Sequence, residues 1–171
     1  MRETELGECL NIMTNLPRKL RDQRGFNLIE LMIVIAIIGL LIGVGTVGWQ
    51  SMMKSGNETT AAQSIKQIQT YQAQYASKNK GKFASFDQLI STVGLDEKFA
   101  GESPVVNGYV FVLTVEEGSA SKPPFYSITS DPQVPTGITA TGTRHYYTDS
   151  SLGTIKATDE NRPAKSDDPA L

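Results

Sequence analysis

The sequence has 171 residues, with 16 Lys and Arg, 18 Asp and Glu, one His and one Cys. That length suits one domain with appendages and excludes a large multidomain enzyme. The formal net charge of -2 lacks the basic footprint that duplex nucleic acid requires, so we predict no direct nucleic-acid binding. One Cys and one His cannot complete a usual Cys/His zinc site.

The N-terminal residues change character near Met13. Residues 1–12 carry three Glu against one Arg, which is the wrong sign for the start of a targeting segment. A chain that began at Met13 would have a compact basic leader and would lack Cys9, so Met1 and Met13 are alternative starts. The basic cluster before the apolar run consists of Arg18, Lys19, Arg21 and Arg24 against Asp22.

An apolar segment follows this cluster directly. Residues 31–53 contain no charged side chain, and Glu30 is the one ionisable residue in the stretch 28–49. Twenty helical residues at about 1.5 Å each cover roughly 30 Å, the thickness of a bilayer's hydrocarbon core. We therefore predict one membrane-spanning helix with the residues after it exported, because basic residues mark the cytoplasmic side. An A-x-A cleavage pattern does not follow the apolar run, so we do not expect its loss as a signal peptide.

The junction between leader and apolar segment reads RGFNLIE over residues 24–30. Together with the basic leader and the immediate spanning segment, it resembles the processing site of type IV pilins and of the pseudopilins of type II secretion systems. The resemblance implies that a membrane-embedded prepilin peptidase cuts after Gly25 and methylates the new N-terminal residue, Phe26. The motif and its helix cover roughly residues 18–78, and Asn27 stands where Thr or Ser is more usual.

The resemblance also implies a function and partners. The expected protein is a structural subunit that polymerises through its apolar helix into a homo-oligomeric pilus filament. Its expected partners are prepilin peptidase, an inner-membrane assembly platform and a cytoplasmic assembly ATPase. The precursor would be a single-pass inner-membrane protein, and the mature form would lie in an extracellular or periplasmic filament. The alternatives are a secretion pseudopilin and a non-polymerising, membrane-anchored binding protein.

The presence of Glu30, a carboxylate, within the apolar segment requires an explanation. A carboxylate deep in a bilayer costs about 3 kcal/mol on insertion scales, so it needs a partner. Cleavage after Gly25 would create a cationic amine at Phe26. In stacked subunits Glu30 could then pair with a neighbour's amine, an arrangement that specifies register more than it adds stability. The alternative is a carboxylate that snorkels toward the headgroups.

Four glycines interrupt the apolar helix: Gly39, Gly43, Gly45 and Gly48. Gly39 and Gly43 have the G-x-x-x-G spacing that lets membrane helices approach closely. Ordinary tolerance of glycine in a membrane helix is the alternative. Many pilins have a proline near the place of Val47, and here the glycines could supply the same softness, since each costs about 1 kcal/mol of helix propensity. We expect residues 39–48 to extend or melt when subunits enter a filament.

The helical pattern continues into an amphipathic half over residues 54–80. Mostly apolar residues recur there at spacings of three and four, and Tyr71 flanks them. This spacing predicts a stripe on one face of the helix that packs on a globular domain. The predicted helix runs from Leu28 to Ser77 and ends at Gly81 as a left-handed cap. The stripe consists of Ala61, Ile65, Ile68, Gln72 and Tyr75.

The remaining residues predict an α+β domain, a long N-terminal helix packed on a small antiparallel sheet. A short helix over 85–90 should face Phe86, Leu89 and Ile90 inward. The predicted strands are 109–115, 125–129, 144–148 and 154–157, with 131–142 irregular. The chain thus divides into a leader (1–25), a transmembrane assembly half (26–53), an amphipathic half (54–80), an exported domain (81–160) and a loose C-terminal tail (161–171).

The exported part offers little catalytic chemistry. Cys9 would be in the removed leader, so it can form neither a disulfide nor a thiol–imidazole pair with His145. The acidic pairs 116–117 and 167–168 indicate solvated charge, and we expect no enzyme activity. Some pseudopilins bind calcium, for which Asp131 and Asp149 are conceivable ligands. A hard cation needs six or more oxygens, so we favour turn chemistry for both residues and expect no cofactor.

Overall fold

The structure, a computed structural model, describes residues 26–171. The predicted leader, including Gly25, lies outside the described residues. The chain divides into two units, Met1–Ile42 and Gly43–Leu171. The long helix α2 spans Leu28–Lys78 and therefore contributes to both units. This agrees with the predicted helix to within one residue at its C-terminal end.

The C-terminal end of α2 differs from the prediction in one detail. Lys80, with φ 54°, already adopts the left-handed conformation that the sequence assigned to Gly81. Gly81 follows with φ 81°, and its N–H donates to the Ala76 carbonyl at 2.9 Å. This is the six-to-one hydrogen bond of a Schellman motif. In that motif the residue before the N–H donor, here Lys80, adopts the left-handed conformation. The cap is therefore Lys80, and Gly81 completes it.

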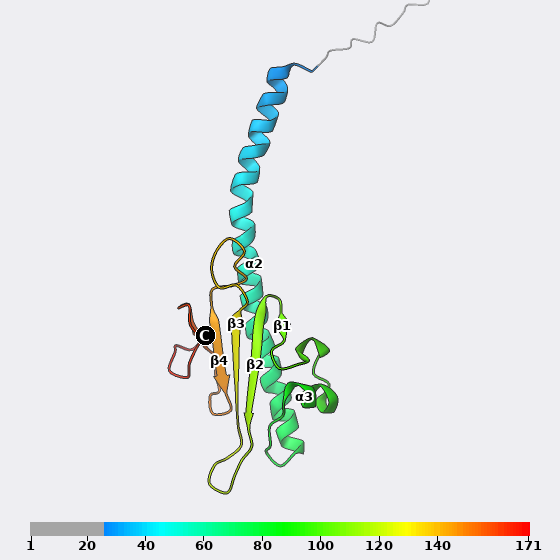
Figure 1. The fold of residues 1–171 in the computed structure, drawn as a ribbon, viewed down its shortest axis with the longest axis vertical. Coiled ribbons are helices and arrows are strands. Elements are labelled where there is room, and N and C mark those ends of the chain that lie inside the picture. The colour runs from blue at the N-terminus through cyan, green and yellow to red at the C-terminus, as the bar shows by residue number, and fades with distance from the viewer. Residues whose placement is uncertain (1–25) are drawn as a thin grey trace, which may run out of the picture. The chain divides into compact units, whose positions relative to one another are not determined.

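The second unit contains one five-stranded antiparallel sheet with the strand order β1-β2-β3-β4-β5, a simple meander (Figure 1). Two short helices, α3 (Phe86–Val93) and the 3-10 helix η1 (Glu97–Phe99), precede it. The strands are β1 (Val105–Val106), β2 (Tyr109–Glu116), β3 (Phe125–Pro132), β4 (His145–Asp149) and β5 (Lys156–Thr158). The α+β prediction is thus confirmed.

Strand β3 is longer than predicted, and β1 and η1 were not predicted. The sequence suggested that β3 ends at Thr129 because residues 131–142 contain two prolines and two glycines and were expected to be irregular. In the structure, residues 130–132 pair with β2, with Pro132 opposite Tyr109. Pairing with neighbouring strands therefore overrides the local preference, and the irregular segment begins at Gln133 rather than at residue 131. Two-residue β1 is too short to show a period in the sequence.

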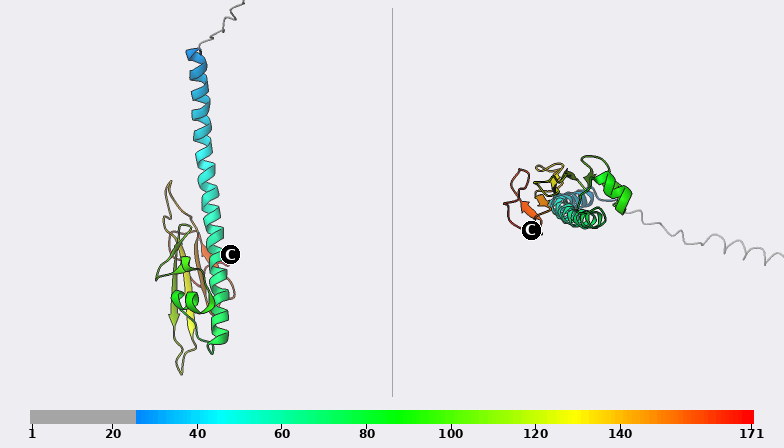
Figure 2. Two further views of the ribbon diagram at one scale, coloured as in Figure 1. Left: turned by 90° about the vertical axis from the view of Figure 1, so that its right-hand side faces the viewer. Right: turned by 90° about the horizontal axis from the view of Figure 1, so that it is seen from below.

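The core of the second unit lies between α2 and one face of the sheet, and Figures 1 and 2 show this part of α2 along that face. Ala61, Ile65 and Ile68 are buried against aromatic and aliphatic side chains of β2, β3 and β4, as the predicted stripe requires. The sheet's contribution comes from alternate strand residues, which point to one face. Its fully buried hydrophobic members are Tyr109, Phe111, Ile128 and Tyr146.

Gln72 sits in the middle of this apolar stripe and is fully buried. Its amide nitrogen donates to the Ala84 carbonyl at 2.6 Å, and the Ala84 N–H donates to its side-chain oxygen at 3.0 Å. Because a buried amide is costly unless its polar atoms are paired, this exchange of bonds explains why Gln is tolerated there. The same bonds fix the segment after α2 against the helix. Ser85 then begins α3 with a reciprocal capping box to Gln88.

The C-terminal residues 161–171 are not the loose tail that the sequence predicted. Ala157 donates its N–H to the Pro169 carbonyl at 2.9 Å, and Leu171 donates to the Ile155 carbonyl at 2.9 Å. Residues 169–171 therefore continue the sheet beside β5 and pair its outer edge. The prediction failed because Pro163 and Pro169 and the absence of periodicity suggested a loose chain, whereas these bonds use single carbonyls and N–H groups that need no periodic pattern.

Candidate functional site

The start of α2 places the predicted processing residues. The Asn27 side-chain oxygen accepts from the Ile29 N–H at 3.3 Å. The Asn27 carbonyl accepts from the N–H of Glu30 at 3.0 Å and from that of Leu31 at 3.2 Å. Asn27 is therefore the N-cap of α2. Asn, Ser and Thr are all favoured N-caps, which gives a physical reason for Asn at a position where Ser or Thr is more usual.

Phe26 lies just outside the helix, and Glu30 lies in its first turn. The Phe26 side chain is 89% exposed, and Phe26 and Asn27 both precede the first helical residue, Leu28. Glu30 is the third helical residue, where a carboxylate is stabilised by the positive end of the helix dipole. The structure thus brings Phe26 and Glu30 to the same end of α2. Gly25, the residue before the predicted cleavage, lies outside the described residues.

The first unit exposes an apolar helix surface. Every described residue from 28 to 42 is exposed, and α2 is long and apolar enough to cross a membrane. Such a surface is unstable in water and needs lipid or other helices around it. The large apolar side chains exposed there are Leu28, Ile29, Leu31, Met32, Ile33, Val34, Ile35, Ile37, Ile38, Leu40, Leu41 and Ile42.

The four predicted flexibility residues, Gly39, Gly43, Gly45 and Gly48, all lie within the continuous helix α2. A Cβ atom built at any of them would meet nothing within 4 Å. Their small size therefore relieves no clash within the single chain. The expectation that they soften the helix in a filament stays a prediction, as does their role in close helix contact.

His145 in the second unit is buried and pairs with the partly exposed Asp131. Its Nδ1 lies 2.5 Å from Asp131 Oδ1, and the His145 side chain is almost fully buried. Its Nε2 has no hydrogen-bond partner among the residues that the structure describes. The neighbouring Ser130 hydroxyl is on the opposite face of β3, because successive strand residues alternate. His145 and Asp131 thus stabilise the β3–β4 pairing and reach no nucleophile in the described part of the chain.

Neither conceivable calcium ligand is free of protein contacts. Asp131 is occupied by His145, while Asp149 Oδ1 accepts from the N–H groups of Ser151 and Leu152 at 2.8 and 2.9 Å. The turn donors and Tyr147 hold the pKa of Asp149 below its usual value although partial burial opposes them. Within residues 26–171, no group of three or more metal-ligating side chains is present. Turn chemistry accounts for Asp149, whereas the turn role expected of Asp131 is wrong, because this residue lies in strand β3 and pairs with His145.

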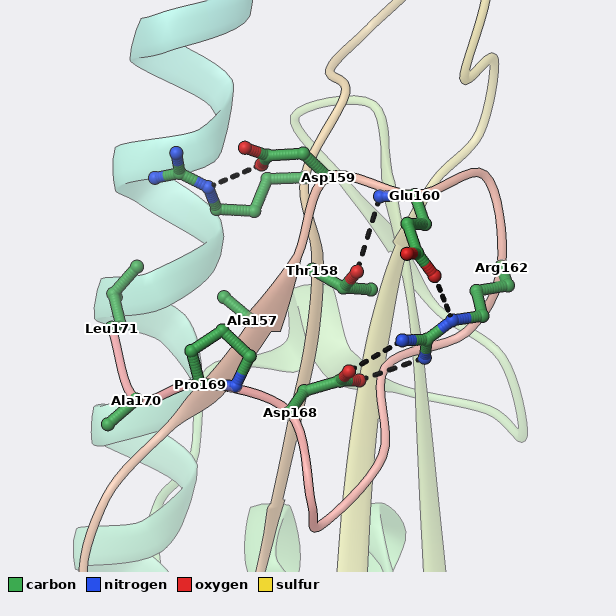
Figure 3. A pocket seen from close by; sticks show the side chains of 10 residues that line it. Ala157, Thr158, Asp159, Glu160, Arg162, Asp168, Pro169, Ala170 and Leu171 are labelled. Atoms are coloured by element: carbon green, nitrogen blue, oxygen red, sulfur yellow. Dashed lines mark hydrogen bonds and ion pairs between the residues drawn. The ribbon is translucent and has the colours of Figure 1, made fainter.

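A charged hollow of about 490 Å³ lies between β5 and the C-terminal segment (Figure 3). Arg162 forms a bidentate pair with Asp168 at 2.6 and 2.9 Å and also contacts Glu160 at 2.6 Å. Arg144 pairs with Asp159 at 2.9 Å. Asp168 is buried, so the sequence's interpretation of residues 167–168 as solvated charge is wrong for this residue. Both arginines pair with carboxylates of the same chain, and these ion pairs stabilise the C-terminal segment.

Sequence reasoning missed two of these features. The capping role of Asn27 could have been found, because Asn three residues before Glu marks a helix start. The Asp131–His145 pair could not, since the two residues are 14 positions apart and meet only when β3 and β4 pair.

The comparisons with known proteins match the N-terminal site alone. No curated protein and no solved structure matches the chain. One family description matches, the prokaryotic N-terminal methylation motif, over residues 20–46. This range contains the predicted cleavage position, the capped start of α2 and the exposed apolar surface. The chain therefore carries the N-terminal methylation signal of type IV pilins and pseudopilins, on a long helix that fits a membrane-anchored precursor.

Proposed function

We infer that this protein is a structural subunit of a type IV pilus-like filament. Prepilin peptidase would cut the precursor after Gly25 and methylate Phe26, and the mature chain would polymerise through its apolar helix. The observation that carries the proposal is the methylation motif at residues 20–46, on a helix whose described residues 28–42 are all exposed. Proteins with this signal are structural rather than catalytic.

The geometry at the start of α2 supports cleavage between Gly25 and Phe26. A peptidase needs an extended backbone at the bond that it cuts, and a helix would hide that bond in its hydrogen-bonded turns. The Asn27 cap begins the helix at Leu28 and leaves Phe26 outside it. The new N-terminal amine would then lie one residue before the cap, at the positive end of the helix dipole.

The same geometry supports a role for Glu30 in assembly. An amine at a helix N-terminus is disfavoured by the dipole, and a carboxylate in an apolar environment is disfavoured by desolvation. Pairing the Phe26 amine of one subunit with Glu30 of a neighbour would relieve both costs. The uncut precursor has an uncharged amide at Phe26 and cannot form this pair. Polymerisation would therefore require cleavage, because only the cut chain has the charged amine.

The proposal is tested by expressing the full chain in cells that hold prepilin peptidase and its assembly machinery, then shearing the cells. We expect the sheared fraction to contain protein that begins at N-methylated Phe26, identified by mass spectrometry. The Gly25→Leu variant should stay uncut and membrane-bound. A wild-type chain with an intact N-terminus, or one cut elsewhere, would overturn the processing proposal.

The Glu30→Ala variant separates processing from assembly. We expect it to be cut normally but to yield few or no filaments. The matched control is Glu102→Ala, which removes an exposed carboxylate from the second unit and should assemble like wild type. Abundant filaments from Glu30→Ala would contradict the pairing of Glu30 with the Phe26 amine while leaving the cleavage proposal intact.

A secretion pseudopilin is the second candidate function. Many type IV pilins close their C-terminal region with a disulfide, whereas the single Cys of this chain is Cys9, before the proposed cut. The second unit instead closes its sheet edge with the hydrogen bonds of residues 169–171. The two candidates differ in filament length: mature protein in the sheared fraction favours a pilus, and mature protein confined to the periplasm favours a pseudopilin.

A further inference from the structure

One end of the sheet carries an uncharged loop to which the proposed function gives no role. Residues 133–144 connect β3 to β4. Residues 133–143, here called the tip loop, contain no Asp, Glu, Lys, Arg or His, and Arg144 at the base of the connection pairs with Asp159. Residues 136–139 at its tip are exposed. Ile138 is 78% exposed, more than any other large apolar side chain of the second unit. A single exposed isoleucine is ordinary on a protein surface, so the inference depends on where the tip loop lies and on its lack of charge.

The tip loop has a defined shape rather than a free chain. The Thr141 N–H donates to the Val134 carbonyl at 2.9 Å, and the Val134 N–H donates to the Thr141 hydroxyl at 3.2 Å. These two bonds close the neck of the loop. At the tip, Gly137 adopts a φ of 92°, and its carbonyl accepts from the Ala140 N–H at 3.3 Å. Ile138 is therefore held outward by a closed turn.

Side chains of α2 hold the base of the tip loop. The Asn57 amide donates to the Thr141 carbonyl at 2.8 Å, and Glu58 accepts from the Thr143 N–H at 2.9 Å. In Figures 1 and 2 the loop extends from the strand ends in the direction of the part of α2 that precedes Asn57 within the second unit. The tip therefore lies beside the part of α2 that precedes Asn57.

That part of α2 has the composition of a membrane interface. Residues 43–53 are uncharged, and Trp49 and Met52 are 66% and 72% exposed. Lys54 is the first charged residue after the apolar segment. Trp is enriched at membrane interfaces, and Lys there extends its charge toward the headgroups. Trp49 and Asn57 are eight residues apart, about 12 Å along the helix axis, so the loop starts within reach of the level of Trp49.

We propose that residues 136–139 dock into the headgroup layer of the bilayer that holds α2, with Ile138 at the boundary of the acyl chains. The opposite end of the sheet supports this choice of occupant, because the β2–β3 connection there carries Glu117 and Lys122, both exposed. The tip loop differs from the β2–β3 connection in that its residues 133–143 carry no charge, as a contact with the bilayer requires. Docking would fix the orientation of the second unit on the membrane through two points, α2 and the tip loop.

The test measures the depth of one loop position in a bilayer. The full, uncut chain with Cys9→Ser and Ile138→Cys is spin-labelled and reconstituted into vesicles of phosphatidylethanolamine and phosphatidylglycerol. The matched control carries Ala120→Cys, an exposed position in the β2–β3 connection. Electron paramagnetic resonance gives collision rates with oxygen, which concentrates in the bilayer, and with a water-soluble nickel chelate. We expect the oxygen-to-nickel ratio at residue 138 to exceed that at residue 120 several-fold.

Equal ratios at the two positions, with both variants folded by circular dichroism, would overturn the proposal. So would a label at residue 138 that is accessible to nickel in vesicles but protected in assembled filaments, because the occupant would then be a neighbouring subunit. The inference rests on the anchoring of α2 and not on cleavage or polymerisation. Since the labelled chain is the uncut precursor, a failure of the processing proposal would leave this readout unchanged.

Discussion

At the scale of single residues, Asn27 determines where α2 begins. Its side chain accepts from the Ile29 N–H, which the helix cannot satisfy internally, and its carbonyl accepts the first helical bonds, from the N–H groups of Glu30 and Leu31. This places Phe26 in an exposed, non-helical position and Glu30 in the first turn. The chemistry proposed at Phe26 and Glu30 therefore depends on a third residue that takes no part in it.

The Asn27→Ala variant should loosen the start of α2. An N-cap is worth about 1 kcal/mol, which corresponds to roughly a fivefold change in the local opening equilibrium. We expect amide hydrogen exchange at Ile29 to accelerate by about that factor in detergent micelles, measured by NMR. The control is Asn27→Ser, which keeps a capping oxygen and should exchange like wild type. Equal acceleration in both variants would contradict the capping role.

At the scale of elements, Gln72 joins α2 to the segment that leaves it. The sequence placed Gln72 on the apolar stripe by its spacing, and the structure shows why a polar residue belongs there. Both of its side-chain polar atoms bond to the buried backbone of Ala84. Those bonds direct the chain from the end of α2 toward α3, whose Phe86 stacks on Phe99 at a ring-centroid distance of 6.0 Å.

Replacing Gln72 with Leu should destabilise the second unit even though the stripe becomes more apolar. The Ala84 N–H and carbonyl would be left buried without partners, at a cost of about 2 kcal/mol or more in the free energy of unfolding. Denaturant unfolding of the full chain in detergent measures this. The control Gln63→Leu makes the same change on an exposed face of α2 and should stay within about 0.5 kcal/mol of wild type. Similar effects of the two substitutions would contradict the argument.

At the scale of the whole molecule, the C-terminal segment completes the second unit. Residues 169–171 pair the edge of β5, and the Arg162–Asp168 pair holds the turn that leads to them. An unpaired edge strand invites association with other chains. In a protein proposed to polymerise through its helix, closing this edge removes one alternative route of association.

This arrangement predicts a pH dependence of stability. Hydrogen bonds from Arg162, and then from the Lys165 N–H, lower the pKa of Asp168 to about 2 from its usual value near 4. The pKa of the Asp168 carboxyl is lower in the folded state than in the unfolded state. Its contribution to the free energy of unfolding is therefore present above about pH 4 and is lost as the pH falls toward about 2. The Asp168→Asn variant should therefore melt at a lower temperature than wild type at neutral pH.

The difference between Asp168→Asn and wild type should shrink as the pH falls from about 4 to about 2, in thermal unfolding scans of the full chain. Asp167→Asn is the control, since the neighbouring carboxylate is exposed and should give a wild-type melting curve. If the difference in melting temperature stayed constant down to about pH 2, the Arg162–Asp168 pair would stabilise the fold through its shape and not through the charge of Asp168.

The sequence by itself determined the features that depend on local pattern. The junction at residues 24–30, the length of the apolar run and the three-and-four spacing of the stripe predicted the processing signal, the helix from Leu28 and its buried face. These features are readable because neighbours along the chain set helix periodicity and membrane insertion. The strand predictions succeeded for the same reason where residues alternate, as in β2.

Only the tertiary structure decided the features that depend on residues distant in the chain. The extension of β3 to Pro132, the burial of His145 with Asp131 and the pairing of residues 169–171 with β5 each need partners from another strand. The position of the tip loop beside α2 likewise depends on bonds that span more than 80 residues, from Asn57 and Glu58 to Thr141 and Thr143. Such contacts leave no local period, because each is a single bond made by a polar group whose partner is chosen by the fold.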